Sequence, residues 1–165
     1  MQKLGIAVFS LITFVFFACL TPLTLIAEGT EFGGIISSDQ RWTKENSPYR
    51  LVDRVQIANG ATLFIEPGAV IEGGGSGIQV FGTVKARGAE FTNVPFFFKN
   101  EDVGELPAIE LVNVVMINRY GYDWPMTSGS YGLFSLTDSV VINKSSSPTS
   151  ISITSKSRGS INIAR

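Results

Sequence analysis

Three segments of this chain read VKARGAEFTN (residues 84–93), IELVNVVMIN (109–118) and FSLTDSVVIN (134–143), and they recur with a constant 25-residue period. The first, third and eighth positions of every segment are apolar, and asparagine closes each one. Short alternating segments at a fixed period are typical of repeat proteins, in which equivalent residues of successive coils stack. The stretch 84–143 therefore predicts an all-β solenoid.

The closing residues of these segments, Asn93, Asn118 and Asn143, predict a structural ladder at one corner of the coil. Asparagine tolerates the left-handed backbone conformation that a tight corner needs, and stacked amides can hydrogen-bond to one another along the axis. The same alternation puts Lys85 and Glu110 in one outward column, one coil apart, which favours parallel stacking. The alternative is three ordinary hairpin strands whose spacing coincides.

The periodic pattern begins upstream, near residue 55, as short strands separated by glycines. Pro67 followed by Gly68 suits the two central positions of a type II turn. Strands this short are typical of a coil that turns several times in each repeat. The apolar and turn residues of this stretch form the pattern Val55-x-Ile57-x-x-Gly60-x-x-Leu63-x-Ile65-x-Pro67-Gly68-x-x-Ile71, then Ile78-x-Val80-x-Gly82-x-Val84-x-Ala86.

Together with Trp42 and Ser47-Pro48-Tyr49, this pattern resembles the opening of many secreted right-handed parallel β-helix proteins. The resemblance covers about residues 42–93. It implies a right-handed parallel β-helix, for which we expect about five coils. The resemblance says little about function, because such proteins include adhesins, glycan-processing enzymes and uncharacterised surface proteins.

Residues 1–27 are predicted to be a signal peptide, because Lys3 precedes an apolar run and Leu25-Ile26-Ala27 offers a cleavage point before Glu28. We therefore expect a secreted or cell-surface protein. Two alternatives involve the membrane: the run stays uncleaved as an anchor, or Cys19, the single cysteine, is lipidated.

The remaining chain is divided into a cap, residues 28–52, and a parallel β-helix, residues 53–165. We expect Trp42 and Tyr49 to plug the first coil; a sugar-stacking role for Trp42 is the alternative. The tail from residue 145 alternates like a shorter coil and is followed by nothing resembling a cap. We expect either a truncated member of a longer family or pairing with another chain at that end.

The strongest concentration of aromatic rings lies in the segment 119–131, which together with 94–107 is predicted to loop out between coils. Rings with one polar edge suit stacking on sugars or protein interfaces, so a polysaccharide or a surface protein is the expected partner. For the position of this loop, however, we favour an account in which it covers an outward apolar patch of Val115, Ile117, Val140 and Ile142, because an uncovered patch would be unusual for a soluble monomer. The candidate ligand-binding residues are Tyr120, Tyr122, Trp124 and Tyr131.

The composition excludes several kinds of chemistry. The chain has no histidine, so triads that need one are excluded, and no zinc spacing or phosphate-binding loop occurs. Thirteen basic against fourteen acidic residues leave no basic stripe for nucleic acid. We expect no cofactor and no metal. Carboxylate catalysis remains open, with two candidate sets: Asp123 and Asp138 with Arg119, or Glu101, Asp102 and Glu105 with Lys99.

Three hypotheses about function follow. The first is a secreted or surface-associated, non-catalytic module, structural or adhesive, that binds glycan or protein through its inter-coil loops. The second is a polysaccharide lyase or glycosidase of the β-helix type. The third is a truncated fragment of a longer surface protein. The sequence favours the first, because no catalytic set stands out from the background of fourteen carboxylates.

Overall fold

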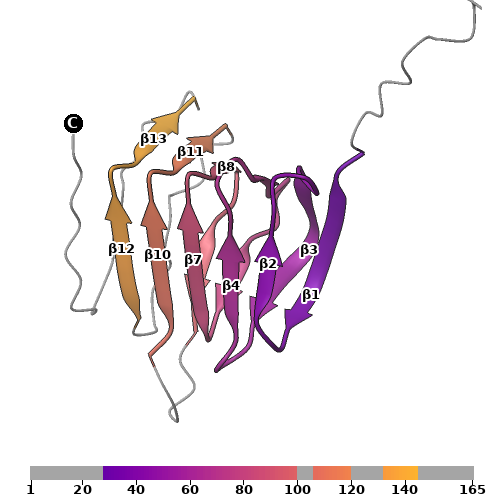
Figure 1. Ribbon diagram of the computed structural model, residues 1–165, viewed down its shortest axis with the longest axis vertical. Helices are drawn as coiled ribbons and strands as arrows, with labels where there is room; N and C mark the ends of the chain where they lie inside the picture. The colour runs from indigo at the N-terminus through magenta and orange to yellow at the C-terminus, as the bar shows by residue number, and fades with distance from the viewer. Residues whose placement is uncertain (1–27, 100–105, 120–131, 145–165) are drawn as a thin grey trace, which may run out of the picture.

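The computed structural model describes residues 28–99, 106–119 and 132–144. Within these ranges the chain contains no helix, and parallel strands coil into a solenoid of about four turns (Figure 1). The predicted all-β parallel solenoid is therefore confirmed, with about four turns in the described residues where about five coils were expected; the predicted signal peptide, residues 1–27, lies outside the described residues. The strands are β1 (Thr30–Ile36), β2 (Gln40–Trp42), β3 (Tyr49–Ile57), β4 (Thr62–Ile65), β5 (Val70–Glu72), β6 (Ile78–Val80), β7 (Thr83–Arg87), β8 (Glu90–Thr92), β9 (Phe96–Phe98), β10 (Ala108–Val112), β11 (Val115–Asn118), β12 (Leu133–Thr137) and β13 (Val140–Asn143).

These strands build three faces around one core. The first face is the five-stranded sheet in the order β12-β10-β7-β4-β2, which lies at the front of Figure 1. The eight-stranded sheet supplies the other two, because β3 pairs with β5 near its start and with β6 near its end. The second face holds β5, β8, β11 and β13, and the third holds β6 and β9.

Pairing between coils follows the predicted register. Ile109 pairs with Val84 on one side and with Phe134 on the other, so the 25-residue step is confirmed for these coils. The earlier steps are shorter, because Trp42 pairs with Ile65 and Ile65 in turn pairs with Ala86. The inward residues of these columns are almost all buried in a single apolar core.

At the first corner, between the first and second faces, residues with positive φ stack in successive coils. The apolar pattern of the sequence does not reveal this column of residues. Gly68, Gly88, Asn113 and Asp138 occupy it, with φ of 81°, 59°, 53° and 50°. The amide of each of the first three donates to the next coil, as in Gly68 N to Gly88 O at 2.8 Å. Glycine, asparagine and aspartate are the residues that adopt this left-handed conformation most readily, so the corner selects them.

The segment expected to form a cap, residues 28–52, adds strands of its own to the solenoid. β1 pairs in parallel with β3, and β2 pairs with β4. Trp42 is 1% exposed and stacks on Tyr49 with ring centroids 4.6 Å apart, while Phe32 meets its edge. A ring so deeply buried cannot stack on a sugar, so the alternative role considered for Trp42 is wrong.

Candidate functional site

The four aromatic residues proposed to bind ligand, Tyr120, Tyr122, Trp124 and Tyr131, lie outside the described residues. The structure does place the two ends of their segment. Arg119 follows β11 at the second corner, between the second and third faces, and is exposed. Gly132 precedes β12 at the third corner, between the third and first faces.

The other expected loop returns to the same corner. Lys99 follows β9 on the third face, and Leu106 lies just before β10 on the first face. Leu133 N donates to Pro107 O at 2.8 Å, so the two returning ends stack one coil apart. Leu106 and Leu133 are 50% and 49% exposed there. The third corner is therefore where both candidate binding segments rejoin the solenoid.

The outward apolar patch lies on the second face, on strands β11 and β13. Val115 pairs with Val140, and Ile117 pairs with Ile142. Val140 is 54% exposed, whereas Ile117 is only 8% exposed. Whether the segment 119–131 covers this patch stays a prediction, because most of that segment lies outside the described residues.

The asparagines of the predicted ladder lie at the second corner. Asn118 pairs in register with Asn143. Asn93 adopts φ of 54°, and its side-chain Oδ1 accepts a 2.7 Å hydrogen bond from the backbone amide of Arg119 in the next coil. This bond joins a side chain to backbone. The ladder of amides bonded to one another stays a prediction.

The carboxylate sets proposed for catalysis are only partly described. Asp138 lies at the first corner, while Arg119 lies at the second corner, so a strand of the second face separates them. At a strand rise of about 3.3 Å per residue, that separation is roughly 15 Å. The spacing of about 5 to 10 Å in a glycosidase applies to its two carboxylates, here Asp123 and Asp138, and not to the distance between Asp138 and Arg119. Asp123, Glu101, Asp102 and Glu105 lie outside the described residues.

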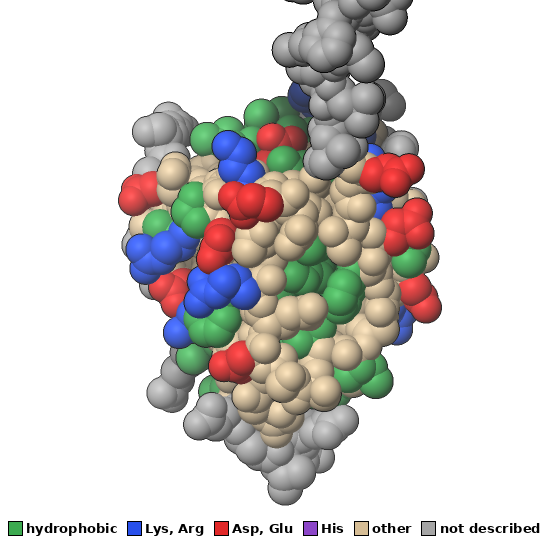
Figure 2. Space-filling view, turned by 45° about the vertical axis from the view of Figure 1, so that its right-hand side comes forward, with side chains coloured by type: hydrophobic (Ala, Val, Ile, Leu, Met, Phe, Trp, Pro, Cys, Tyr) green, Lys and Arg blue, Asp and Glu red, His purple; other side chains and the backbone are tan. Residues whose placement is uncertain are grey.

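The first face carries charges of both signs in close alternation. Arg41 bonds to Glu66 at 3.0 Å in the next coil and lies 5.2 Å from the centroid of the Phe64 ring. Lys85 pairs in register with Glu110, as predicted, although no ion pair joins these two side chains. Figure 2 likewise shows basic and acidic side chains mixed rather than gathered into one field. Such exposed pairs contribute under about 1 kcal/mol each.

In the part of the chain that the structure covers, neither metal ligands nor titrating groups point to a further functional site. No group of histidine, cysteine, aspartate and glutamate residues there could hold a metal ion. The pKa of Glu45 is held below its usual value by a hydrogen bond to its own backbone and by the Thr43 hydroxyl. Glu45 is fully exposed between β2 and β3, away from the third corner. No helix among the described residues is long and apolar enough to cross a bilayer.

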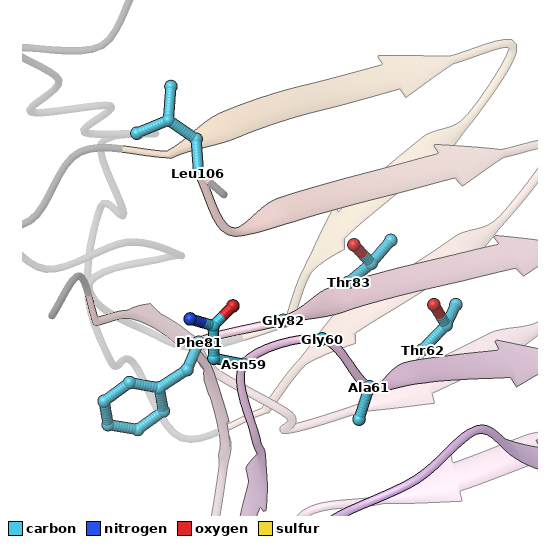
Figure 3. Close-up of a pocket in the computed structure, with 8 residues that line it drawn as sticks. All are labelled: Asn59, Gly60, Ala61, Thr62, Phe81, Gly82, Thr83 and Leu106. Atoms are coloured by element: carbon cyan, nitrogen blue, oxygen red, sulfur yellow. The ribbon is translucent and has the colours of Figure 1, made fainter. Parts of the chain in front are cut away.

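A small pocket opens at the third corner (Figure 3). It measures about 60 Å³ and is built from equivalent turns of successive coils. Thr62 and Thr83 begin neighbouring strands and pair in register. No periodic pattern in the sequence pointed to this pocket, because its residues come from turns whose spacing varies. Its lining consists of Asn59, Gly60, Ala61, Thr62, Phe81, Gly82, Thr83 and Leu106.

The fold and these corner sites define a short parallel β-solenoid with two inter-coil segments that rejoin it at one corner. In comparisons with known proteins, no family model, curated protein or solved structure matches this chain. The resemblance to secreted β-helix proteins therefore stays a prediction.

Proposed function

We propose that the chain is a secreted or surface-associated, non-catalytic solenoid module that binds a glycan or a surface protein through segments 94–107 and 119–131. The observation that carries this proposal is the convergence of both segments on the third corner, one coil apart. Binding residues are often presented on loops that a rigid scaffold holds in place. Stacked coils provide such a scaffold here.

Binding of the full chain to a glycan array and to extracted surface proteins tests the role of the rings. We expect Tyr122→Ala and Trp124→Ala each to weaken binding about tenfold or more, because aromatic anchors dominate the energy of most interfaces. Phe64→Ala is the matched control, since Phe64 lies on the first face under Arg41. Binding that is unchanged in both loop variants would exclude these rings as the contact.

Export is tested by the N-terminal sequence of the protein recovered outside the cytoplasm. We expect Glu28 as the first residue. Glu28 is hydrogen-bonded to the solenoid, because Arg50 Nη1 donates to Glu28 O at 2.8 Å. Close to it, Thr30 N donates to Pro48 O at 2.8 Å. Recovery of the whole protein inside the cytoplasm would contradict the proposed location.

A further inference from the structure

Two threonine hydroxyls line the third-corner pocket, and the described part of the fold leaves their hydrogen-bonding capacity unused. Thr62 and Thr83 are both half-buried. Figure 3 shows their hydroxyls pointing to the same side of β4 and β7. Their backbone amides are bonded, Thr62 N to Asp39 Oδ1 at 2.8 Å and Thr83 N to Ala61 O at 2.9 Å. Neither hydroxyl bonds to any other residue in the described part of the chain.

The spacing of these hydroxyls suits a single oxygen atom. Neighbouring strands lie about 4.8 Å apart, so two equivalent side-chain hydroxyls are separated by a similar distance. An oxygen placed between them, slightly outward, lies about 2.8 Å from both, which is the typical length of a hydroxyl hydrogen bond. Each threonine hydroxyl can donate one bond and accept others, so a ligand hydroxyl can satisfy both.

Size and charge narrow the kind of group that fits. A volume of about 60 Å³ admits a few non-hydrogen atoms, far less than the roughly 300 Å³ or more of pockets that enclose a whole small molecule. No lining residue is ionisable, and the Asp39 carboxylate accepts a hydrogen bond from Thr62 N beside the pocket. A neutral group is therefore favoured over an anion. Leu106, which is 50% exposed, adds an apolar side chain for a methylene, whereas the Ala61 methyl belongs to the buried core.

We propose that this pocket takes the hydroxymethyl group of a neutral hexose unit, with its oxygen between the hydroxyls of Thr62 and Thr83 and its methylene toward Leu106. The inference rests on the proposed glycan-binding function and deepens it. The shape of the pocket depends on Gly82, where any side chain would meet the carbonyl oxygens of Ala58 and Ala61.

Three methyl glycosides that differ at one carbon test the ligand, using nuclear magnetic resonance titration of the labelled full chain. Methyl glucoside carries the hydroxymethyl group, methyl xyloside lacks it, and methyl glucuronide replaces it with a carboxylate. We expect glucoside to shift the amide signals of Thr62, Thr83 and Leu106 with millimolar affinity, and xyloside to bind about three- to tenfold more weakly. Equal affinity for glucoside and xyloside, or tighter binding of glucuronide, would overturn the proposal.

Isosteric variants test the hydroxyls. Thr62→Val and Thr83→Val keep the side-chain shape and the strand preference, and the backbone bonds of both residues do not involve the hydroxyl. We expect each to weaken glucoside binding about three- to tenfold, whereas Thr92→Val on the second face leaves it unchanged. Unchanged affinity in both pocket variants, with folded spectra, would refute the role of these hydroxyls.

The two proposals fail in different ways. A chain that binds a glycan on the array while glucoside leaves the pocket signals unmoved overturns the pocket inference and leaves the proposed function standing. A chain whose pocket signals move with glucoside, but whose array binding survives both loop variants, supports the pocket and removes the loops as the main contact.

Discussion

Gly82 shows how closely successive coils approach at one residue. A Cβ atom at this position would lie against the carbonyl oxygens of Ala58 and Ala61, which belong to backbone and cannot swing away. We expect Gly82→Ala to lower the free energy of unfolding by about 1 to 3 kcal/mol, because the inserted methyl forces the two coils apart. Urea denaturation followed by circular dichroism measures this change.

The control for Gly82 is Gly74→Asn. Gly74 has φ of 53° and open space around its Cβ position. Asparagine adopts that conformation at little cost, so we expect a change of under about 0.5 kcal/mol. If both variants lose the same stability, contact between coils is not what requires glycine at position 82.

Single residues also show what the pattern could reveal. The left-handed conformation predicted for the asparagine corner is found at Asn93 but not at Asn118, which is the last residue of β11. Asn113 and Asp138 share it, at the same 25-residue step, yet the periodicity of the apolar positions gives no sign of them. The residue types at these positions could have predicted this corner, because glycine, asparagine and aspartate, found at positions 88, 113 and 138, are the types that adopt positive φ.

At the scale of the strand, Leu111 on β10 shows how much the stacking of core side chains contributes to the free energy of unfolding. It is fully buried between Ala86 of β7 and Leu136 of β12. We expect Leu111→Ala to cost about 2 to 5 kcal/mol of unfolding free energy, since both neighbouring strands hold the cavity open. Leu133→Ala is the control, because that side chain is 49% exposed and we expect a loss under about 1 kcal/mol. Equal losses would argue against a stacked core at position 111.

The strands were predictable where coil length is constant and much less so elsewhere. The 25-residue step placed β7, β8 and their partners in the correct register. Shorter and unequal steps hid the same stacking upstream, because corners absorb insertions at little cost in loop entropy. The pocket was missed for this reason. Its turns at Asn59 and Phe81 come close only after uneven coils have closed.

At the scale of the whole molecule, a solenoid is held together chiefly by contacts between neighbouring coils. Removal of one whole coil should therefore leave a shorter version of the same fold. Deletion of residues 88–112 joins Arg87 to Asn113, whose φ of 53° suits the corner position that Gly88 holds at 59°. Because Arg87 pairs with Val112, every later residue keeps its inward or outward direction. We expect a folded, all-β and less stable protein that still unfolds cooperatively, as circular dichroism and urea denaturation would show.

A deletion one residue longer, 88–113, supplies the decisive comparison. It joins Arg87 to Val114 and shifts β11 by one position, so that Met116 turns outward while Val115 turns inward. A one-residue slip exchanges the two sides of a strand, and the asparagine needed for the corner is lost as well. We expect this variant to be insoluble or unfolded although it differs from the first deletion at a single position. If both deletions behaved alike, the coil would not be the unit of this structure.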